Sequence, residues 1–226
     1  MKSILKNSNG NAVSTNGKLL GKPEGVDRLK KLLDTTKSAV RLFHDYQGTR
    51  IDDLISYSDT ENVTNMTEFC NGCYYLTYFP PLNTSKVTNM SYLLQNCFGL
   101  TNSIIQLDTS NVTNMAGLIN GCRLLTTIDI TSMDKITSIY SLASICSNCY
   151  SLTKFIVRTM TVIPPLNTNS FQSCHHFTGT VNATYNPEGL KDGRIYVPDD
   201  FVEQLKSATN WSAYADIIVP LSTLEE

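Results

Sequence analysis

The sequence is poor in positive charge and contains no long hydrophobic run. It has 18 lysines and arginines against 20 aspartates and glutamates, which gives a formal net charge of −2. A chain without a basic surface lacks the electrostatic footprint of a nucleic-acid-binding protein, so we expect no nucleic-acid partner. No apolar stretch is long enough to span a bilayer, and residues 1–10 contain no hydrophobic signal segment. We therefore expect a chain without a membrane span that stays in the cytoplasm unless a larger assembly carries it out.

Signs of catalysis are also scarce. The sequence contains no Gly-x-Ser-x-Gly, no His-Glu-x-x-His and no phosphate-binding loop. Its only histidines are His44, His175 and His176. We therefore predict a binding protein rather than an enzyme, with no catalytic residues and no cofactor.

A repeat organises the middle of the chain. Val-Thr-Asn-Met occurs at 63–66, 87–90 and 112–115, and each copy is followed by a cysteine seven residues after the methionine. Cysteines recur at this repeat position with spacings of 24, 25, 27 and 25 residues, and a large apolar residue follows each by three positions: Cys73, Cys97, Cys122, Cys149 and Cys174. In the fourth unit Ile136-Thr137-Ser138-Ile139 replaces the motif, and three inserted residues delay the cysteine. A period of this length with an apolar skeleton is typical of leucine-rich repeats.

Repeats of this kind predict columns of equivalent residues. Strands of successive units pair about 4.8 Å apart, so one column should hold Val63, Val87, Val112 and Ile136, and another Met66, Met90, Met115 and Ile139. We expect these columns to form the core. Asn65, Asn89 and Asn114 should form a third column that satisfies backbone groups at a bend.

The cysteines favour packing over chemistry. Five of the seven share one repeat position, which fits a structural ladder of buried free thiols better than a disulfide framework. Cys70-x-x-Cys73 and Cys146-x-x-Cys149 have the sequence form of a zinc site. The two pairs lie three units apart, or about 14 Å, whereas zinc needs every sulfur at about 2.3 Å. We therefore expect no metal, and a local disulfide within either pair remains open.

The flanks differ from the repeats. Residues 1–22 are polar and predict an extended arm that is either an attachment segment or disordered. Residues 23–50 have apolar residues at helical spacing and predict a capping helix or, alternatively, a short coiled-coil helix. Repeats fill 51–181, in which Pro80-Pro81 is expected at a loop or edge. Residues 182–226 predict a C-terminal cap, with a strand at Ile195-Tyr196-Val197 and then a helix in which Asp200 and Glu203 close a capping box.

The Thr-Ser-Asn-Val-Thr-Asn-Met stretch at 109–115, with its copies and the Cys-x-x-Leu that follows, resembles the BspA-like leucine-rich-repeat surface proteins. The ending, from Ile195-Tyr196-Val197-Pro198 to Pro220-Leu221, is similar to that of such chains in gut bacteria and their phages. The predicted fold is therefore one α+β solenoid, a right-handed BspA-like coil of about five units of 24–27 residues with a helical N-terminal cap and a strand-helix C-terminal cap. The resemblance implies display on a surface and adhesion.

One column of residues is the candidate ligand-binding site. The position after each repeat cysteine should point outward, and it carries aromatic or cationic groups that suit a sugar or a protein partner: Tyr74, Phe98, Arg123, Tyr150 and His175. Tyr75, Tyr78 and His176 would widen this column. The alternative is that the rings only stack on one another and cover the bend.

Three functions follow from this reading. The first is a phage virion component, a head or tail fibre or decoration that binds a host-surface protein or glycan and contacts other virion proteins through residues 1–22. The second is a bacterial cell-surface adhesin, and the third is a cytoplasmic protein-binding scaffold. A virion is assembled in the host cytoplasm and needs no export signal. A homo-oligomer is compatible with each of them.

Overall fold

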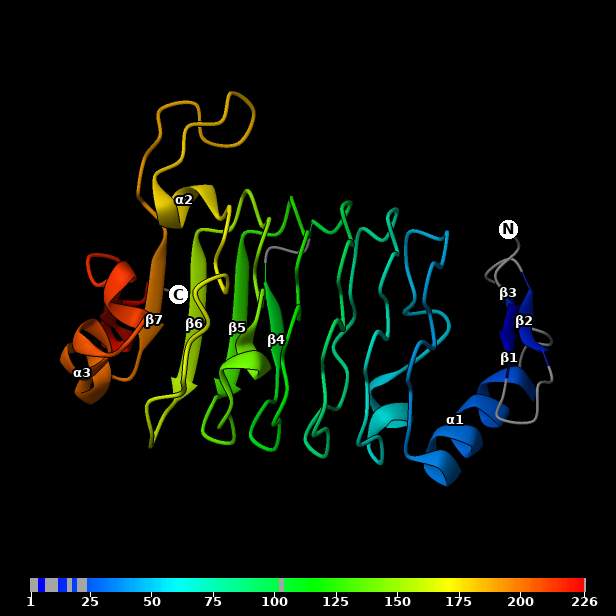
Figure 1. The fold of residues 1–226 in the computed structure, drawn as a ribbon. Helices are drawn as coiled ribbons and strands as arrows, with labels where there is room; N and C mark the ends of the chain where they lie inside the picture. The colour runs from blue at the N-terminus through cyan, green and yellow to red at the C-terminus, as the bar shows by residue number, and fades with distance from the viewer. Residues whose placement is uncertain (1–3, 7–11, 16–17, 20–23, 102–103, 226) are drawn as a thin grey trace.

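The computed structural model describes the backbone of residues 4–6, 12–15, 18–19, 24–101 and 104–225, and the side chains of residues 30–101 and 104–225. From residue 38 onward the chain runs in successive turns that lie side by side in one row, with α1 at one end and α3 at the other (Figure 1). The helices are α1 (Glu24–Thr36), α2 (His175–Thr178) and α3 (Val202–Ser207). Short 3-10 helices cover Tyr57–Thr60, Ile139–Leu142, Asp199–Phe201, Trp211–Tyr214 and Leu221–Thr223.

Backbone hydrogen bonds join neighbouring turns along one side of the row, which we call the bend ladder. In each turn an N–H donates to a carbonyl of the next turn: Phe43 to Phe69 at 2.8 Å, Cys70 to Leu93 at 2.8 Å, Leu94 to Leu118 at 2.9 Å, Ile119 to Ile145 at 3.0 Å and Cys146 to Ser170 at 3.0 Å. Isolated parallel bridges also link Ser38, Asn65, Asn89 and Asn114 in succession. The bend ladder therefore runs through five contacts between turns without a gap.

A parallel sheet lies on the other side of the later turns. Its strands follow chain order, β4 (Ile105–Leu107), β5 (Thr127–Ser132), β6 (Lys154–Thr159), β7 (Arg194–Val197) and β8 (Ile218–Pro220). Gln106 pairs with Asp129, Asp129 with Ile156, Ile156 with Tyr196 and Tyr196 with Val219. β5 and β6 are rich in β-branched residues, which fit a pleated, half-buried surface. The sheet therefore joins the later repeats to the C-terminal segment.

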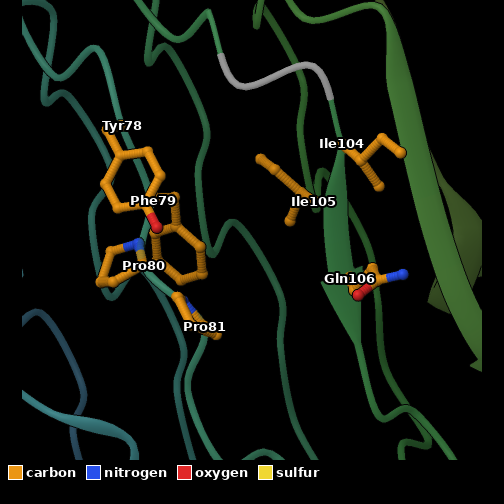
Figure 2. A pocket seen from close by; sticks show the side chains of 7 residues that line it. All are labelled: Tyr78, Phe79, Pro80, Pro81, Ile104, Ile105 and Gln106. Carbon is orange, nitrogen blue, oxygen red and sulfur yellow. The ribbon is translucent and has the colours of Figure 1, made fainter.

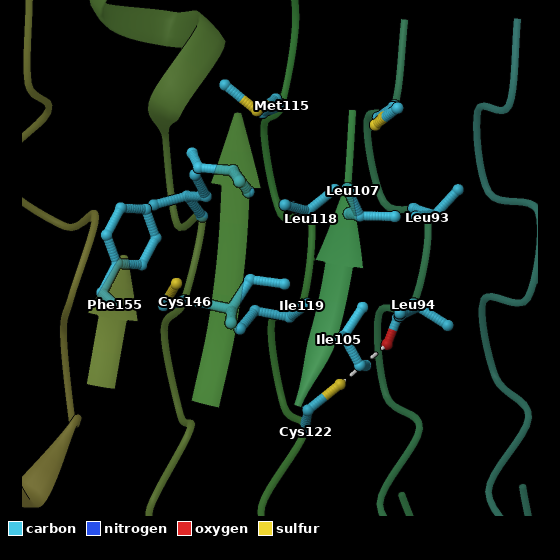
Figure 3. Close-up of a cluster of buried hydrophobic side chains, with 14 of the residues drawn as sticks. Leu93, Leu94, Ile105, Leu107, Met115, Leu118, Ile119, Cys122, Cys146 and Phe155 are labelled. Carbon is cyan, nitrogen blue, oxygen red and sulfur yellow. Dashed lines mark hydrogen bonds between the residues drawn. The ribbon is translucent and has the colours of Figure 1, made fainter. Parts of the chain in front are cut away.

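The core lies between the bend ladder and the sheet. Val63, Val87, Val112 and Ile136 are buried, as are Met66, Met90 and Met115, so the valine column is confirmed. Figure 3 shows Leu118 and Ile119 from the bends meeting Ile105 and Leu107 from β4. Each turn thus buries its apolar side chains against its neighbours rather than alone.

The prediction that Ile139 continues the methionine column is wrong. Ile139 is 44% exposed, and the fully buried Leu142 takes the place of the methionine. The register shows why, because Met115 N–H donates to Ser141 O, whereas Met66 and Met90 donate to Asn89 and Asn114. The four-residue 3-10 helix Ile139–Leu142 takes up the three inserted residues, so the residue at the methionine position is Leu142 and not Ile139.

The predicted helix over 23–50 is also wrong in its second half. α1 ends at Thr36, and Lys37 has a positive φ of 52°. After it, Ala39 N–H donates to Asn65 O and Arg41 N–H to Thr67 O, so this segment is the first stacked turn. Pairing with the next turn satisfies the backbone in place of helix hydrogen bonds and overrides the helical periodicity.

The described residues of the arm and of the C-terminal segment also depart from expectation. β1 (Ile4–Lys6), β2 (Ala12–Thr15) and β3 (Lys18–Leu19) pair as antiparallel neighbours, so these parts of the arm fold back instead of running extended, and the rest of 1–22 lies outside the described residues. The C-terminal segment runs from β7 into α3, and Trp211 is buried with its Nε1 donating to Pro164 O at 2.8 Å. The capping box is wrong, because Phe201 precedes α3 without a side-chain cap.

Candidate binding surface

The five predicted site residues lie in one continuous stack, the aromatic–arginine ladder. The Tyr74 and Phe98 rings stack with centroids 5.1 Å apart. The Arg123 guanidinium lies over the Phe98 ring at 4.2 Å and over the Tyr150 ring at 5.6 Å. Tyr150 and His175 stack at 4.8 Å with an angle of 2° between their planes. Each member comes from the same bend of a successive turn, since the hydrogen bonds of the bend ladder fix the register between turns.

Exposure falls along the aromatic–arginine ladder. Tyr74 is 44% exposed, Phe98, Arg123 and Tyr150 are half-buried, and His175 is 6% exposed. The side chain after the repeat cysteine therefore points outward at Tyr74, in the first of these turns, and is covered at His175, in the last. The stacking that the alternative interpretation predicted is present, and it leaves the Tyr74 end open for contact with a ligand.

A sixth side chain belongs to the stack, and the sequence analysis missed it. Tyr185 lies 5.0 Å from the Tyr150 ring, on the segment between α2 and β7. His176 holds this segment, because its Nε2 lies 3.0 Å from Tyr185 O and its Nδ1 lies 2.7 Å from Asp192. Tyr185 follows no repeat cysteine, so the repeat spacing gave no signal for it.

The three residues predicted to widen the column have different positions. Tyr75 is 59% exposed beside Tyr74. Tyr78 instead lies under the Arg50 guanidinium at 4.3 Å, away from the ladder. His176 is half-buried and engaged with Asp192 and Tyr185. Only Tyr75 thus extends the exposed end.

Two buried polar atoms of the aromatic–arginine ladder have no hydrogen-bond partner among the described residues. They are Nε of Arg123 and Nδ1 of His175. Burial lowers the pKa of His175, and the nearby His176 lowers it further, so the imidazole is neutral at pH 7. An unpaired buried polar group costs free energy. His175 therefore carries this cost at Nδ1 while its ring stacks in parallel on the ring of Tyr150.

The repeat cysteines are buried and free. Each thiol donates to a carbonyl of the preceding turn: Cys73 to Phe43, Cys97 to Cys70, Cys122 to Leu94, Cys149 to Ile119 and Cys174 to Cys146. Figure 3 shows the Cys122 bond, which is 3.1 Å long. Burial raises the pKa of the Cys97, Cys146 and Cys149 thiols, and that of Cys174 to about 12. Hydrogen bonding with the Cys70 and Cys97 side chains instead lowers the pKa of the Cys73 thiol to about 5, although this thiol is fully buried. The raised pKa values of the other four thiols suit packing and hydrogen bonding rather than nucleophilic attack.

The C-x-x-C pairs are reduced, and within the described part of the chain no group of three His, Cys, Asp or Glu residues is placed to hold a metal ion.

The asparagine column serves the backbone. Oδ1 of Asn65, Asn89 and Asn114 each accepts from the N–H two residues later, at 2.9 to 3.0 Å. The amides therefore act within their own turn rather than on a ligand.

A cavity of about 460 Å³ lies beside β4, on the side of the turns that carries the sheet (Figure 2). Its lining is Tyr78, Phe79, Pro80, Pro81, Ile104, Ile105 and Gln106. Pro80 and Pro81 have no N–H and form no strand, as the sequence reading expected. The cavity is thus the place where strand pairing begins, and no residue of the aromatic–arginine ladder lines it.

A protein family described as "Mycoplasma protein of unknown function, DUF285" matches residues 37–159 and 79–184. Together these matches run from 37 to 184, which is 148 of the 226 residues. The chain belongs to this family. It is a family of BspA-like surface-protein repeats, so the predicted resemblance is confirmed at that level.

The limits of the DUF285 match agree with the geometry of the turns. The match begins at residue 37, directly after α1, where the first stacked turn starts. It contains the five predicted members of the aromatic–arginine ladder but not Tyr185, β7, α3 or β8. No curated protein matches the chain. In the part of the chain that the structure describes, no helix has the length and apolar character needed to cross a membrane.

Proposed function

We propose that this BspA-like chain is a non-enzymatic adhesion module and that its aromatic–arginine ladder contacts a host or mucosal surface ligand. The observation that carries the proposal is the stack of side chains from successive turns with an exposed Tyr74 and Tyr75 at one end. Rigid rings offer a large contact area with little loss of conformational entropy, which is why aromatic side chains dominate binding surfaces. Membership of a family of surface-associated repeats supports the same function.

The fold is part of this proposal. We propose that the stacked turns form a right-handed leucine-rich-repeat solenoid, because several backbone N–H groups of each turn pair with the next turn and the apolar columns are shared between turns. A solenoid is a scaffold that presents equivalent positions at regular spacing. Adhesion through one such column needs no catalytic group.

The proposed carrier is a phage particle, which the similarity of the C-terminal ending to phage chains favours. Residues 1–22 are the proposed contact with other virion proteins. Peptide mass spectrometry of purified particles should then detect this chain, and labelling of residues 205–226 in electron micrographs should place it on the head or the tail. Its absence from particles, with the chain found on bacterial surfaces or in the cytosol, would contradict the virion assignment but not adhesion itself.

The ladder is tested by a double substitution, Tyr74→Ser with Tyr75→Ser. Both side chains are largely exposed, so the fold should persist, while attachment of the purified chain to host cells or mucus should fall about tenfold. Tyr140→Ser is the matched control, since Tyr140 is 74% exposed but lies on the inserted 3-10 helix. Equal attachment of both variants and the parent chain, with unchanged thermal unfolding, would reject the ladder as the contact surface.

A further inference from the structure

Arg123 is the one cationic guanidinium in the aromatic–arginine ladder, and it lies between two rings. Its Cζ is 4.2 Å from the Phe98 centroid and 5.6 Å from the Tyr150 centroid. Contact with both rings restricts the side chain to a small range of orientations. Its Nε is buried, and neither that atom nor the terminal nitrogens donate to any acceptor among the described residues. The guanidinium is therefore held in place with its hydrogen-bonding capacity unused.

The other described arginine side chains are all engaged. Arg41 pairs with Glu68 at 2.9 Å, Arg50 with Asp52 at 2.7 Å and Arg158 with Asp129 at 2.6 Å, and Arg194 donates to the carbonyls of Lys191 and Gly193. Arg50 resembles Arg123 in lying over a ring, that of Tyr78 at 4.3 Å. It differs because a carboxylate already neutralises it. A fixed and unpaired guanidinium is thus a property of Arg123 within the described part of the chain.

We infer that Arg123 recognises a carboxylate on the ligand and that this ligand is an acidic glycan. The inference rests on the adhesion function proposed above and specifies the chemistry of its ligand. A guanidinium presents parallel N–H donors that match a carboxylate in a two-point hydrogen bond. The exposed rings of Tyr74 and Tyr75 supply apolar faces for the C–H surface of neighbouring sugar units.

Polar groups beside the rings suit the remaining hydroxyl groups of a sugar. The amide oxygen of Asn96 and the Phe98 ring both border Gly121, whose missing Cβ would lie 2.9 Å from the first and 3.4 Å from the second. Asn148 Nδ2 donates to Asn120 Oδ1 at 3.3 Å on the next turns. Side-chain amides thus lie on the same bends as the rings, where a few polar groups beside apolar faces can fix the orientation of a sugar.

Charge density decides between an acidic glycan and a dense polyanion. The chain has a net charge of −2, and the aromatic–arginine ladder carries one guanidinium. A polymer with a charge on every unit would meet one cation in the aromatic–arginine ladder, so most of its charges would lie against uncharged rings and stay unpaired. A glycan with occasional carboxylates, such as a sialylated chain, instead places one anion at Arg123 and neutral units on the rings.

The test compares acidic and neutral glycans on the full chain. Polymer-linked sialyllactose is the acidic probe, and polymer-linked lactose is its neutral counterpart. Oligogalacturonate, which has a carboxylate on every unit, serves as the dense polyanion and should bind no better than lactose. We expect the parent chain to bind the acidic probe about tenfold more tightly than its neutral counterpart, the size of one charge-assisted interaction. Arg123→Gln should remove that difference, and Arg123→Lys should restore only part of it because an ammonium lacks the planar fork. Arg50→Gln is the matched control and should leave binding unchanged.

The outcomes separate this inference from the adhesion proposal. Equal binding of acidic and neutral glycans by the parent chain and by Arg123→Gln would overturn the role of Arg123, while loss of attachment in the Tyr74→Ser and Tyr75→Ser variant would still support adhesion. Binding to a polyglutamate peptide in place of both glycan classes would identify an acidic protein as the partner and overturn the glycan assignment. Loss of binding in Arg50→Gln equal to that in Arg123→Gln would also overturn it, since charge alone would then explain the effect.

Discussion

The two sides of the row of turns are held together differently. The bend ladder runs without interruption from the turn at Phe43 to the turn at Ser170. The sheet begins only at β4, and before it strand-side pairing is reduced to contacts such as the Arg50–Tyr78 bridge and the bond from Thr77 N–H to Thr49 O. The bends therefore form the continuous connection between turns, and the sheet reinforces the later ones.

Local sequence explains where the sheet starts. Pro80 and Pro81 cannot donate hydrogen bonds, so the turn before β4 offers no regular strand. β5 instead has Ile128 and Ile130 facing the core in alternation with polar residues. The cavity beside β4 marks this change. It follows that damage at a bend should cost more stability than the same damage at the sheet margin.

Leu118→Ala tests this difference most strongly. Leu118 is fully buried, and its carbonyl accepts from Leu94 N–H. Removing its side chain should lower the free energy of unfolding by about 2–5 kcal/mol, because close-packed neighbours on three turns leave a cavity that cannot collapse. Urea denaturation followed by circular dichroism measures the loss.

Ile105→Ala is the matched substitution at the sheet margin. Ile105 is also buried but lines the existing cavity, so its neighbours have room to relax and the cost should fall at the lower end of the same range. A larger loss for Ile105→Ala than for Leu118→Ala would show that the sheet, and not the bend ladder, is the principal connection.

Removal of a buried thiol should lower the free energy of unfolding by a smaller amount, and by the same amount in the earlier turns as in the later ones. Cys97→Ala and Cys149→Ala each remove a buried thiol and its hydrogen bond to the preceding turn. Each should cost about 1–2 kcal/mol in a denaturation experiment, from lost packing and one modest hydrogen bond.

Reactivity provides an independent check on the same thiols. Burial excludes reagents and raises the pKa of Cys97 and Cys149, so these two thiols should react with iodoacetamide only after the chain unfolds. Rapid modification of either thiol in the native chain would contradict the buried column.

The repeat spacing was sufficient to predict the valine column, the buried cysteines and the residues that make up the aromatic–arginine ladder. It failed where interactions between turns override local pattern. Helical spacing continues past Thr36, yet Ala39 pairs with Asn65 of the next turn instead. The cysteine spacing gives the length of the insertion before Leu142 but not its position. The motif alignment therefore placed Ile139, which is exposed, in the core. Tyr185 reaches the ladder from outside the repeats, where register carries no information.

The smallest expected effect comes from making the earlier turn resemble the later ones. Pro80→Ile with Pro81→Gln copies Ile105-Gln106 of β4 and supplies two backbone donors beside its edge. Each new backbone hydrogen bond contributes about 0.5–1.5 kcal/mol of stability. Each lost proline removes about 0.4–1 kcal/mol, because proline restricts the conformations of the unfolded chain. The free energy of unfolding should therefore change by less than about 1 kcal/mol. Hydrogen exchange is the sensitive measurement, because amides 105–107 should become more protected if the sheet extends toward Tyr78. Unchanged exchange at these amides would mean that the proline pair does not set the boundary of the sheet. The boundary would then be set by the separation of the turns at the cavity.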